Sequence, residues 1–380
     1  MDQKEASLDY FIMAAEPSAD LHGAELVKEL REIEPNCRIA SVSGPKMREL
    51  DTEVILPMEK LLAMGFIDII SAMPRLVFIF YKLLHTILKL NPKVCIFIDY
   101  PGFNLRLERA LKKRGYKGKL IHYVSPTVWA WSKGRIPMMA ENLDHLLTIF
   151  PFESKCYAHT PLKVSYVGNP LVHKVKSHLP KKTFASARRI SLFPGSRQKE
   201  IERNLPQQIK ALESLESSGW DFALSISSEK YRPLIEKIVS KSALKIELIE
   251  PKDSYDLMQN TYLAIATSGT VTLELALHNV PTVVTFAVRP IDLFIVRRIL
   301  KIDLPFYCIV NIIQNEEVFP ELFGPNLSIN KLSYYVTRFL SNEKAKESCC
   351  QKLEELRAGL ESDHPAKKAA KIISSEVHVK

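Results

Sequence analysis

The chain lacks the patterns of a metal-binding, secreted or membrane-spanning protein. Its six cysteines form no C-x-x-C pair and have no histidine partner at zinc-finger spacing, which favours a reducing compartment. Residues 1–5 are acidic and polar, whereas a secretory signal has a basic region that leads into an apolar core. The most apolar window, residues 76–88, contains Lys82 and His85 and is shorter than the ~20 residues of a membrane span. We therefore expect no secretion, and an interfacial or core helix over this window.

Common phosphate-binding and metal-binding motifs are absent as well. The P-loop pattern G-x-x-x-x-G-K and the dinucleotide-binding pattern G-x-G-x-x-G do not occur, which disfavours a nucleoside triphosphatase and a dehydrogenase. No Asp-x-Asp occurs, and no histidine–cysteine cluster has the spacing of metal ligands. We expect a metal-independent protein with no resident cofactor.

The chain does have the composition of an ordinary globular protein. Its 380 residues (43.3 kDa) are 46% apolar and 25% charged, and this length favours two domains. A net charge of +9 would attract nucleic acid, an anionic membrane surface or phosphorylated substrates. Because the basic residues are dispersed and no recognition motif accompanies them, we do not expect nucleic acid as a partner.

Short apolar runs alternate with helical patterns along most of the chain, which is typical of parallel sheets with crossover helices. The sequence therefore predicts an α/β protein of two Rossmann-like, doubly wound domains, with a cleft between them and helices at the C-terminus. The expected strands are residues 8–14, 38–42, 94–98, 119–124, 146–150 and 164–168, followed by 190–193, 222–226, 245–249, 263–266 and 282–286. The expected helices include residues 20–33, 105–114, 292–300, 330–340 and 345–360.

The domain boundaries follow from where this alternation stops and restarts. The basic, polar segment after residue 172 shows no hydrophobic period, which is typical of a linker. We expect a first domain over residues 1–172, a linker over 173–187, a second domain over 188–328 and a helical segment over 329–380.

Ligands of open α/β sheets bind beyond the carboxyl ends of the strands, where loops lead into helix N-termini. The loop after the first expected strand carries Glu16, Ser18, Asp20 and His22, which makes these four residues candidates for ligand binding. The alternative is that Ser18 or Asp20 only caps the next helix.

A carboxylate directly follows the wholly apolar strand 94–98. Asp99 would be partly desolvated at the edge of the sheet, where its pKa can rise toward that of a useful general base. The same loop ends at Asn104, a further candidate. The alternative is an Asx turn that leads into the following Pro-Gly.

The first strand of the second half leads into a loop suited to phosphate. Gly195 allows a tight turn, Ser196 can cap the next helix, and Arg197 could pair bidentately with a phosphate. We therefore expect Ser196 and Arg197 at a phosphate-binding site.

A second loop of this half has the same character. Ser268, Gly269 and Thr270 follow a strand and open a helix, so their backbone N–H groups could bind a diphosphate. Glu274, one turn later, could reach a ribose diol. The alternative is a capped helix with a surface glutamate, but two such loops in one domain favour a nucleotide-diphosphate site.

Residues 65–84 are apolar on nearly every face of the expected helix, whereas a surface helix usually keeps one polar stripe. An exposed apolar patch beside Arg75 and Lys82 would seat the protein on an anionic bilayer or hold acyl chains. The alternative is a core helix. The candidate contacts are Phe66, Ile67, Ile69, Ile70, Met73, Leu76, Val77 and Phe80.

Taken together, the chain resembles the lipid-A-disaccharide synthase family of inverting glycosyltransferases, which have two Rossmann-like domains of the GT-B type. The matching stretches keep the order of the family and cover nearly the whole chain. They are residues 15–24 (AEPSADLHGA), 43–47, 64–65, 99–104 (DYPGFN), 121–131 (IHYVSPTVWAW), 150–153, 167–168, 192–197 (LFPGSR), 267–270 and 273–274.

The resemblance implies a reaction and a role for several residues. UDP-2,3-diacylglucosamine and 2,3-diacylglucosamine 1-phosphate would give a β-1,6 disaccharide and UDP on the route to lipid A. Asp99 would deprotonate the acceptor hydroxyl, while Arg197 and the amides of residues 268–270 would stabilise the leaving diphosphate. Glu274 would hold the ribose, and Asn311 matches a donor-side polar position that is important for activity in the family.

The resemblance also implies a cytoplasmic protein that binds peripherally to the anionic surface of the inner membrane, and it leaves a homodimer open. The chain has Ala15, Ala19, Ser132 and Asn169 where the family usually has Gly, Gly, Arg and His. Two alternatives therefore stay open. One is another GT-B glycosyltransferase that acts on a lipid acceptor, and the other is a catalytically silent, membrane-associated protein that binds UDP-sugars.

Overall fold

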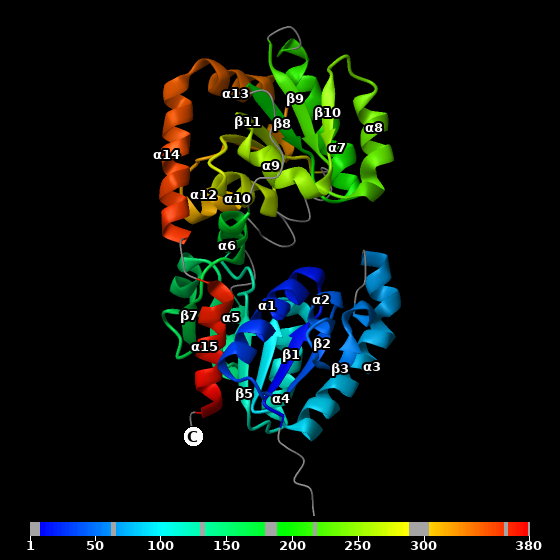
Figure 1. Ribbon diagram of the computed structural model, residues 1–380, viewed down its shortest axis with the longest axis vertical. Helices are drawn as coiled ribbons and strands as arrows, with labels where there is room; N and C mark the ends of the chain where they lie inside the picture. Colours follow the sequence, from blue (N-terminus) through cyan, green and yellow to red (C-terminus); the bar gives the residue numbers. More distant parts are fainter. Residues whose placement is uncertain are drawn as a thin grey trace, which may run out of the picture. The chain divides into compact units, whose positions relative to one another are not determined.

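The structure, a computed structural model, describes residues 8–61, 66–129, 134–178, 188–215, 219–288, 304–360 and 364–378, without the side chains of 66–72 and 378. The chain divides into two compact units (Figure 1). Unit 1 consists of Met1–Pro170 and Ser362–Lys380, and unit 2 consists of Leu171–Glu361.

Unit 1 is built on a seven-stranded parallel sheet with the strand order β3-β2-β1-β4-β5-β6-β7. The two central strands are wholly buried and wholly apolar, as expected for strands covered by helices on both faces. The strands are β1 (Tyr10–Ala14), β2 (Ile39–Ser43), β3 (Glu53–Pro57), β4 (Val94–Ile98), β5 (Lys119–Tyr123), β6 (His145–Thr148) and β7 (Lys163–Tyr166).

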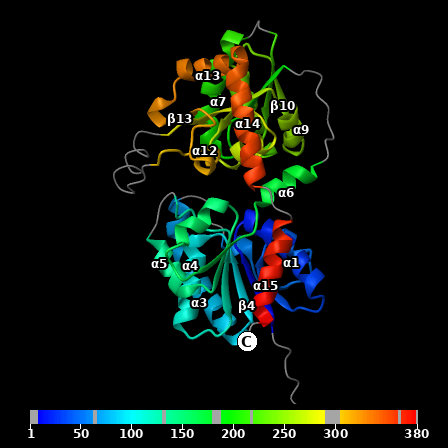
Figure 2. The same ribbon diagram turned by 90° about the vertical axis from the view of Figure 1, so that its left-hand side faces the viewer.

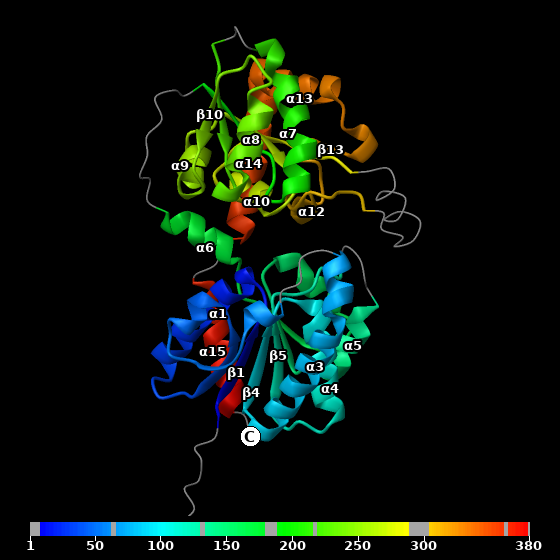
Figure 3. The same ribbon diagram turned by 90° about the vertical axis from the view of Figure 1, so that its right-hand side faces the viewer.

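Helices cover both faces of this sheet. Figure 3 shows α1 and α15 on one face and α3, α4 and α5 on the other, and each face has its own buried apolar cluster. The helices are α1 (Pro17–Ile33), α2 (Pro45–Arg48), α3 (Phe66–Leu90), α4 (Pro101–Lys113), α5 (Arg135–Asn142) and α15 (Pro365–His378), and residues Pro151–Tyr157 form the 3₁₀ helix η2.

The order of the strands creates a switch point between β1 and β4. These two strands are neighbours, yet the helices that follow them, α1 and α4, lie on opposite faces of the sheet (Figure 3). The loops after β1 and β4 therefore diverge at the carboxyl edge, which is where doubly wound sheets bind ligands.

Unit 2 repeats this design with six parallel strands in the order β10-β9-β8-β11-β12-β13. The strands are β8 (Arg189–Phe193), β9 (Asp221–Ser225), β10 (Ile246–Ile249), β11 (Leu263–Thr267), β12 (Thr282–Phe286) and β13 (Glu321–Phe323). Its switch point lies between β8 and β11, which pair in parallel. The prediction of an α/β protein with two doubly wound sheets is confirmed.

The helices of unit 2 lie on both sides of its sheet. α7 packs against α13, whereas α10 packs against α12 and α14 (Figure 3). The bounds are α6 (Pro170–Ser177), α7 (Gln198–Leu212), α8 (Arg232–Val239), α9 (Ser254–Gln259), α10 (Thr270–Leu277), α12 (Ile309–Gln314), α13 (Ile329–Ser341) and α14 (Glu343–Leu360). The expected helix 292–300 lies outside the described residues.

The C-terminal helices do not form the separate segment that we expected over residues 329–380. α13 and α14 pack on unit 2, whereas α15 packs along α1 of unit 1 (Figure 2). The reason is a short apolar face of α15, in which Ala369, Ala370 and Ile373 are fully buried against the core of unit 1. The chain therefore returns to its first domain after completing the second.

Two edge strands and part of the expected linker also differ from the prediction. β3 has mostly exposed or half-buried residues and β13 has only three residues, so neither shows a buried apolar run. Residues 173–177 of the expected linker belong to α6, while residues 179–187 lie outside the described part of the chain.

Candidate functional site

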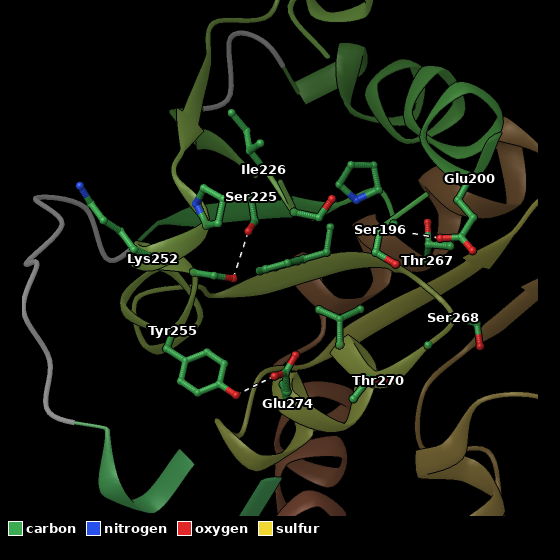
Figure 4. Close-up of a pocket in the computed structure, with 18 of the residues that line it drawn as sticks. Ser196, Glu200, Ser225, Ile226, Lys252, Tyr255, Thr267, Ser268, Thr270 and Glu274 are labelled. Atoms are coloured by element: carbon green, nitrogen blue, oxygen red, sulfur yellow. Dashed lines mark hydrogen bonds between the residues drawn. The ribbon is translucent and has the colours of Figure 1, made fainter. Parts of the chain in front are cut away.

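A cavity of about 810 Å³ lies in unit 2 at the carboxyl ends of β8, β9 and β11. We call it the unit 2 pocket (Figure 4). The two loops that the sequence predicts for a diphosphate both contribute to it, because β8 and β11 are neighbours. The lining residues include Lys174, His178, Pro194, Gly195, Ser196, Glu200, Ser225, Ile226, Lys252, Tyr255, Thr267, Ser268, Gly269, Thr270 and Glu274.

The β8 loop is shaped by a glycine and a glutamate. Gly195 has a φ of 114°, and a Cβ at this position would lie 2.8 Å from the Cβ of Glu200. The Glu200 carboxylate accepts hydrogen bonds from the backbone N–H groups of Ser196 (3.1 Å) and Arg197 (3.3 Å). Sequence reasoning missed Glu200, whose signal is a glutamate at the third position of the helix, as in a capping box.

Ser196 lines the unit 2 pocket, as predicted, but the Arg197 side chain does not. It is 81% exposed, and its Nη1 donates to Glu200 Oε1 at 2.7 Å. An exposed ion pair of this kind contributes little to stability. The guanidinium of Arg197 therefore lies on the surface beside the pocket, from which a change of rotamer could bring it to an anion.

The β11 loop presents backbone donors to the pocket. Ser268, Gly269 and Thr270 all line it, and Gly269 and Thr270 are exposed. Thr270 begins α10, so the first N–H groups of this helix have no partner within the helix and favour an anion. The predicted grouping of these residues with Ser196 is therefore present in the structure.

Glu274 is held in place by a tyrosine that sequence reasoning missed. The Tyr255 hydroxyl donates to Glu274 Oε1 at 2.6 Å (Figure 4), and burial raises the pKa of Tyr255 so that the hydroxyl stays protonated. The Tyr255 ring packs edge-on against His178 and His278, and Lys174 Nζ lies 4.8 Å from its centre. Tyr255 comes from α9, and no sequence motif links α9 to α10.

Asn311 is a correction to the predicted donor set, because it does not line the unit 2 pocket. Its side chain is fully buried, and its Nδ2 donates to Phe319 O (2.7 Å) and to Glu321 Oε1 (2.6 Å). Its Oδ1 accepts from the N–H groups of Val318 and Phe319. With these bonds made, Asn311 holds the turn before β13 rather than a ligand.

In unit 1, Asp99 stands at the switch point in an unusual backbone conformation. Asp99 and Tyr100 both have a φ of 49°, and Val124, after β5, has a φ of 72°. Such conformations cost ~1–3 kcal/mol each and cluster at functional sites. The side-chain amide of Asn104 donates to Asp99 O at 2.7 Å, so Asn104 supports this turn from α4 and is itself fully buried.

The electrostatics of this edge favour a carboxyl group that can take up a proton. Burial raises the pKa of Asp99 above its usual value, while the charge of His122 limits the rise. Burial and the nearby Asp99 carboxylate also raise the pKa of Glu16. Burial lowers the pKa of His22, whose ring lies 6.1 Å from that of Tyr123. The structure thus brings Glu16, from the loop after β1, close enough to Asp99 for their charges to interact.

Of the two residues for which capping was the alternative to ligand binding, Asp20 is a cap and Ser18 is not. Asp20 is 2% exposed, and its carboxylate accepts from the N–H groups of Gly44 (2.8 Å), Lys46 (2.8 Å) and Met47 (3.2 Å). It therefore caps α2, and both of its oxygens already accept hydrogen bonds. Ser18 is exposed in the first turn of α1 and makes no cap hydrogen bond.

α3 carries an exposed apolar surface that we call the α3 stripe. Phe78 is 69% exposed, Tyr81 57%, Met73 49% and Val77 46%. These residues share one face of the helix, because positions 73, 77 and 81 are four residues apart. Of the predicted membrane contacts, Met73 and Val77 are confirmed as exposed, while Leu76 and Phe80 pack on the core of unit 1. The side chains of Phe66, Ile67, Ile69 and Ile70 lie outside the described structure.

Among the described residues, no group of three or more His, Cys, Asp or Glu side chains could hold a metal ion. No helix in the described ranges has the length and hydropathy needed to cross a membrane.

Comparisons with known proteins agree on a family. The family model described as lipid-A-disaccharide synthetase matches residues 10–373. The lipid-A-disaccharide synthase of Coxiella burnetii is 32% identical over 95% of this chain and 96% of its own length. That of Chlamydia pneumoniae is 38% identical over 89% of this chain, but this chain spans only 58% of its length.

Solved structures of low sequence identity share the fold. A UDP-N-acetylglucosamine 2-epimerase-like protein of Listeria monocytogenes matches with a TM-score of 0.63 at 13% identity, over 97% of this chain and 95% of its own. MurG of Acinetobacter baumannii matches with a TM-score of 0.60 at 12% identity, over 97% and 99%. The predicted resemblance is confirmed: the chain belongs to the lipid-A-disaccharide synthetase family.

Proposed function

We propose that this protein is a lipid-A-disaccharide synthase. It transfers 2,3-diacylglucosamine from UDP-2,3-diacylglucosamine to the 6-hydroxyl of 2,3-diacylglucosamine 1-phosphate and releases UDP. The observation that carries the proposal is the unit 2 pocket, in which two strand-to-helix loops and Glu274 meet at the switch point. Membership in the family supports the choice of substrates, and the unit 2 pocket is the proposed binding site of the nucleotide.

In this proposal the unit 2 pocket binds the UDP part of the donor. The N–H groups of Gly269 and Thr270 at the start of α10 hold the diphosphate, and Glu274 accepts hydrogen bonds from the ribose. Arg197 leaves its exposed pair with Glu200 and binds the diphosphate as charge develops on it. Fixed donors of this kind stabilise the leaving group because they need no reorganisation during the reaction.

The acceptor side of the reaction rests on Asp99. The ionised carboxylate takes the proton of the acceptor 6-hydroxyl as its oxygen attacks the anomeric carbon, and the bond to the diphosphate breaks with its electron pair going to UDP. One displacement inverts the configuration at that carbon. Since burial raises the pKa of Asp99, the carboxyl is a better base than a solvated aspartate.

In this proposal the α3 stripe binds the membrane that contains the lipid substrates. Phe78 and Tyr81, with Met73 and Val77, would enter the interface of a bilayer while exposed basic side chains of α3, among them Lys82, face its anionic headgroups. We place the protein at the cytoplasmic face of the inner membrane, bound peripherally.

The proposal is tested by mass spectrometry of the products. Detergent-solubilised protein receives UDP-2,3-diacylglucosamine and 2,3-diacylglucosamine 1-phosphate, with EDTA present. A tetraacyl disaccharide monophosphate would support both the reaction and its independence of metal. A parallel reaction with UDP-N-acetylglucosamine is the control: product from this donor alone would refute the proposal.

Replacing Glu274 tests the assignment of the ribose. Glu274→Gln loses the charge that accepts from the diol, so we expect the Kd for UDP, measured by calorimetry, to rise about tenfold, which is ~1.4 kcal/mol. Tyr255→Phe is the matched control. It removes only the hydroxyl that orients Glu274, so its effect is smaller. An unchanged Kd in Glu274→Gln would remove Glu274 from the nucleotide site.

Replacing the exposed aromatics tests the membrane contact. Phe78→Ser with Tyr81→Ser removes two large apolar groups from the α3 stripe, so we expect at least a tenfold loss of binding to anionic vesicles in a sedimentation assay. Turnover on short-chain, detergent-dispersed substrate should change little. Tyr334→Ser is the control, because Tyr334 is 61% exposed on α13 of unit 2. Equal loss in both proteins would contradict the role of the stripe.

A further inference from the structure

A buried pair of ionisable side chains lies in unit 1 below the switch point. His122 of β5 and Glu108 of α4 are 0% and 1% exposed, and His122 Nδ1 lies 2.6 Å from Glu108 Oε1. Burying two such groups costs free energy unless each is paired. The retained pair is therefore unusual for the core of a sheet, and no part of the proposed function yet uses it.

The geometry of the sheet places this pair beside Asp99. His122 is in register with Phe97 of β4, two residues before Asp99, and the backbone N–H of Asp99 donates to the carbonyl of Tyr123, the residue after His122, at 2.9 Å. α4 bonds both residues: its Asn104 bonds the carbonyl of Asp99, and its Glu108, one turn further, bonds His122. One helix therefore supports the strained turn of Asp99 and the ring of His122.

The other edge of the imidazole is free for a second partner. His122 Nε2 is buried and makes no hydrogen bond in the structure. Leaving a buried nitrogen without a partner costs free energy. Since the charge of His122 acts on the pKa of Asp99, the carboxylate is an electrostatic neighbour of this ring.

Other titratable groups around the pair are mostly uncharged near neutral pH. Burial raises the pKa of Glu153 of η2 to about 8 and that of Cys95 of β4 to about 12. Burial also raises the pKa of Tyr123, next to His122 on β5, so its hydroxyl stays protonated. Glu16, from the loop after β1, faces Asp99 as a second carboxylate, and its own pKa is raised by burial and by Asp99. An imidazolium of His122 is thus the one cation that these interactions bring to Asp99 from the described elements.

We propose that Glu108 and His122 are positioning residues for Asp99. Glu108 accepts the Nδ1–H of an imidazolium, and the Nε2–H of that imidazolium is directed to the Asp99 carboxylate. The cation keeps the buried Asp99 ionised until the acceptor binds, and Glu108 keeps the cation in place. This inference rests on the proposed function, because it gives Asp99 the task of a general base.

His122 and Glu108 neither gain nor lose a proton during the transfer step. The acceptor O–H bond breaks, its proton goes to an Asp99 oxygen, and the acceptor oxygen forms its bond to the anomeric carbon as UDP leaves with the electron pair. Asp99 becomes neutral, and His122 and Glu108 remain as an ion pair of zero net charge. The buried site therefore never holds two unpaired carboxylates.

The pH dependence of turnover tests the proposal. His122→Gln removes the cation, so Asp99 becomes harder to ionise and the acid limb of kcat moves up by about one pH unit. At a pH on that limb kcat falls about tenfold, while the alkaline plateau and KM for the acceptor stay within about twofold. Glu108→Gln should shift the acid limb of kcat in the same direction, but by less than His122→Gln does. His145→Gln is the control, because His145 of the adjacent strand β6 is equally buried and bonds a glutamate, Glu376. Its limb should not move.

A second measurement does not depend on the reaction. Histidine-selective ¹⁵N NMR of the full-length protein follows the His122 ring in the wild type and in Asp99→Asn. Loss of the carboxylate should move the His122 ring signals at a fixed pH towards those of a neutral imidazole, because the coupling is reciprocal. If the wild type makes no disaccharide, the proposed function fails, yet this shift would still show the coupling. Unmoved His122 ring signals, or an acid limb unchanged in both His122→Gln and Glu108→Gln, would overturn the inference.

Discussion

Turnover of the Asp99→Asn enzyme is expected to be ~10²–10⁴ times slower than that of the wild type, which is the usual contribution of a general base. The amide has the size of the carboxylate but cannot take the proton of the acceptor hydroxyl. The turn should persist, because Asn104 bonds the backbone carbonyl of residue 99 and not its side chain. The measurement is kcat from the rate of UDP release.

The controls for this prediction are UDP binding and the pH profile. The Kd for UDP should stay within about twofold, because the nucleotide groups proposed here belong to unit 2. Burial raises the pKa of Asp99, so wild-type activity should be lost as the pH falls through a value above ~3.9, that of a solvated aspartate. The residual activity of Asp99→Asn should lack this acid limb. Turnover at the wild-type rate would remove Asp99 from the mechanism.

Replacing Asp20 should lower the stability of unit 1 without changing the rate of the transfer reaction. Asp20→Ala leaves three backbone N–H groups at the start of α2 without their acceptor. Hydrogen bonds to a charged group contribute ~1.5–3 kcal/mol each and are not additive, so we expect a loss of ~2–4 kcal/mol. The measurement is the thermal unfolding of the full-length protein, in which the transition of unit 1 moves to lower temperature.

The exposed Ser18 provides the matched control for Asp20. Ser18→Ala lies in the same loop-to-helix segment and makes no cap bond, so its effect should stay within ~0.5 kcal/mol. Well below the unfolding transition, Asp20→Ala should keep kcat and KM near the wild-type values. A loss of turnover at unchanged thermal stability would instead restore Asp20 to the acceptor site.

The sequence predicted the loops of the site because loops and strands follow local rules. A short, wholly apolar run such as Val94–Ile98 is typical of a strand buried on both faces, and the residue after such a strand lies at the carboxyl edge. This reasoning put Asp99, Ser196 and the residues 268–270 at sheet edges, where the structure has them. It could not place Glu16 near Asp99 without the strand order, since β1 and β4 are far apart in the chain.

The residues that sequence reasoning missed or misplaced depend on contacts between distant segments. Tyr255 bonds Glu274 from a different helix, and the side chain of Asn311 makes its hydrogen bonds within the turn before β13. Polar residue types cannot by themselves distinguish a ligand contact from a satisfied structural bond, because both use the same donors and acceptors. Asp20 is the plainest case, since a carboxylate near a strand end fits either role.

The sequence by itself determined that the chain is an α/β protein with two doubly wound sheets, and its motifs determined the family. The hydrophobic period and the residue types of the loops are local properties, so they can be recognised in the sequence without knowledge of the fold. The tertiary structure alone decided that α15 returns to unit 1, that α3 has one exposed stripe, and that His122 and Glu108 form a buried pair. Each of these depends on which surfaces are buried against each other, and burial sets both the exposure of an apolar side chain and the cost of a charge.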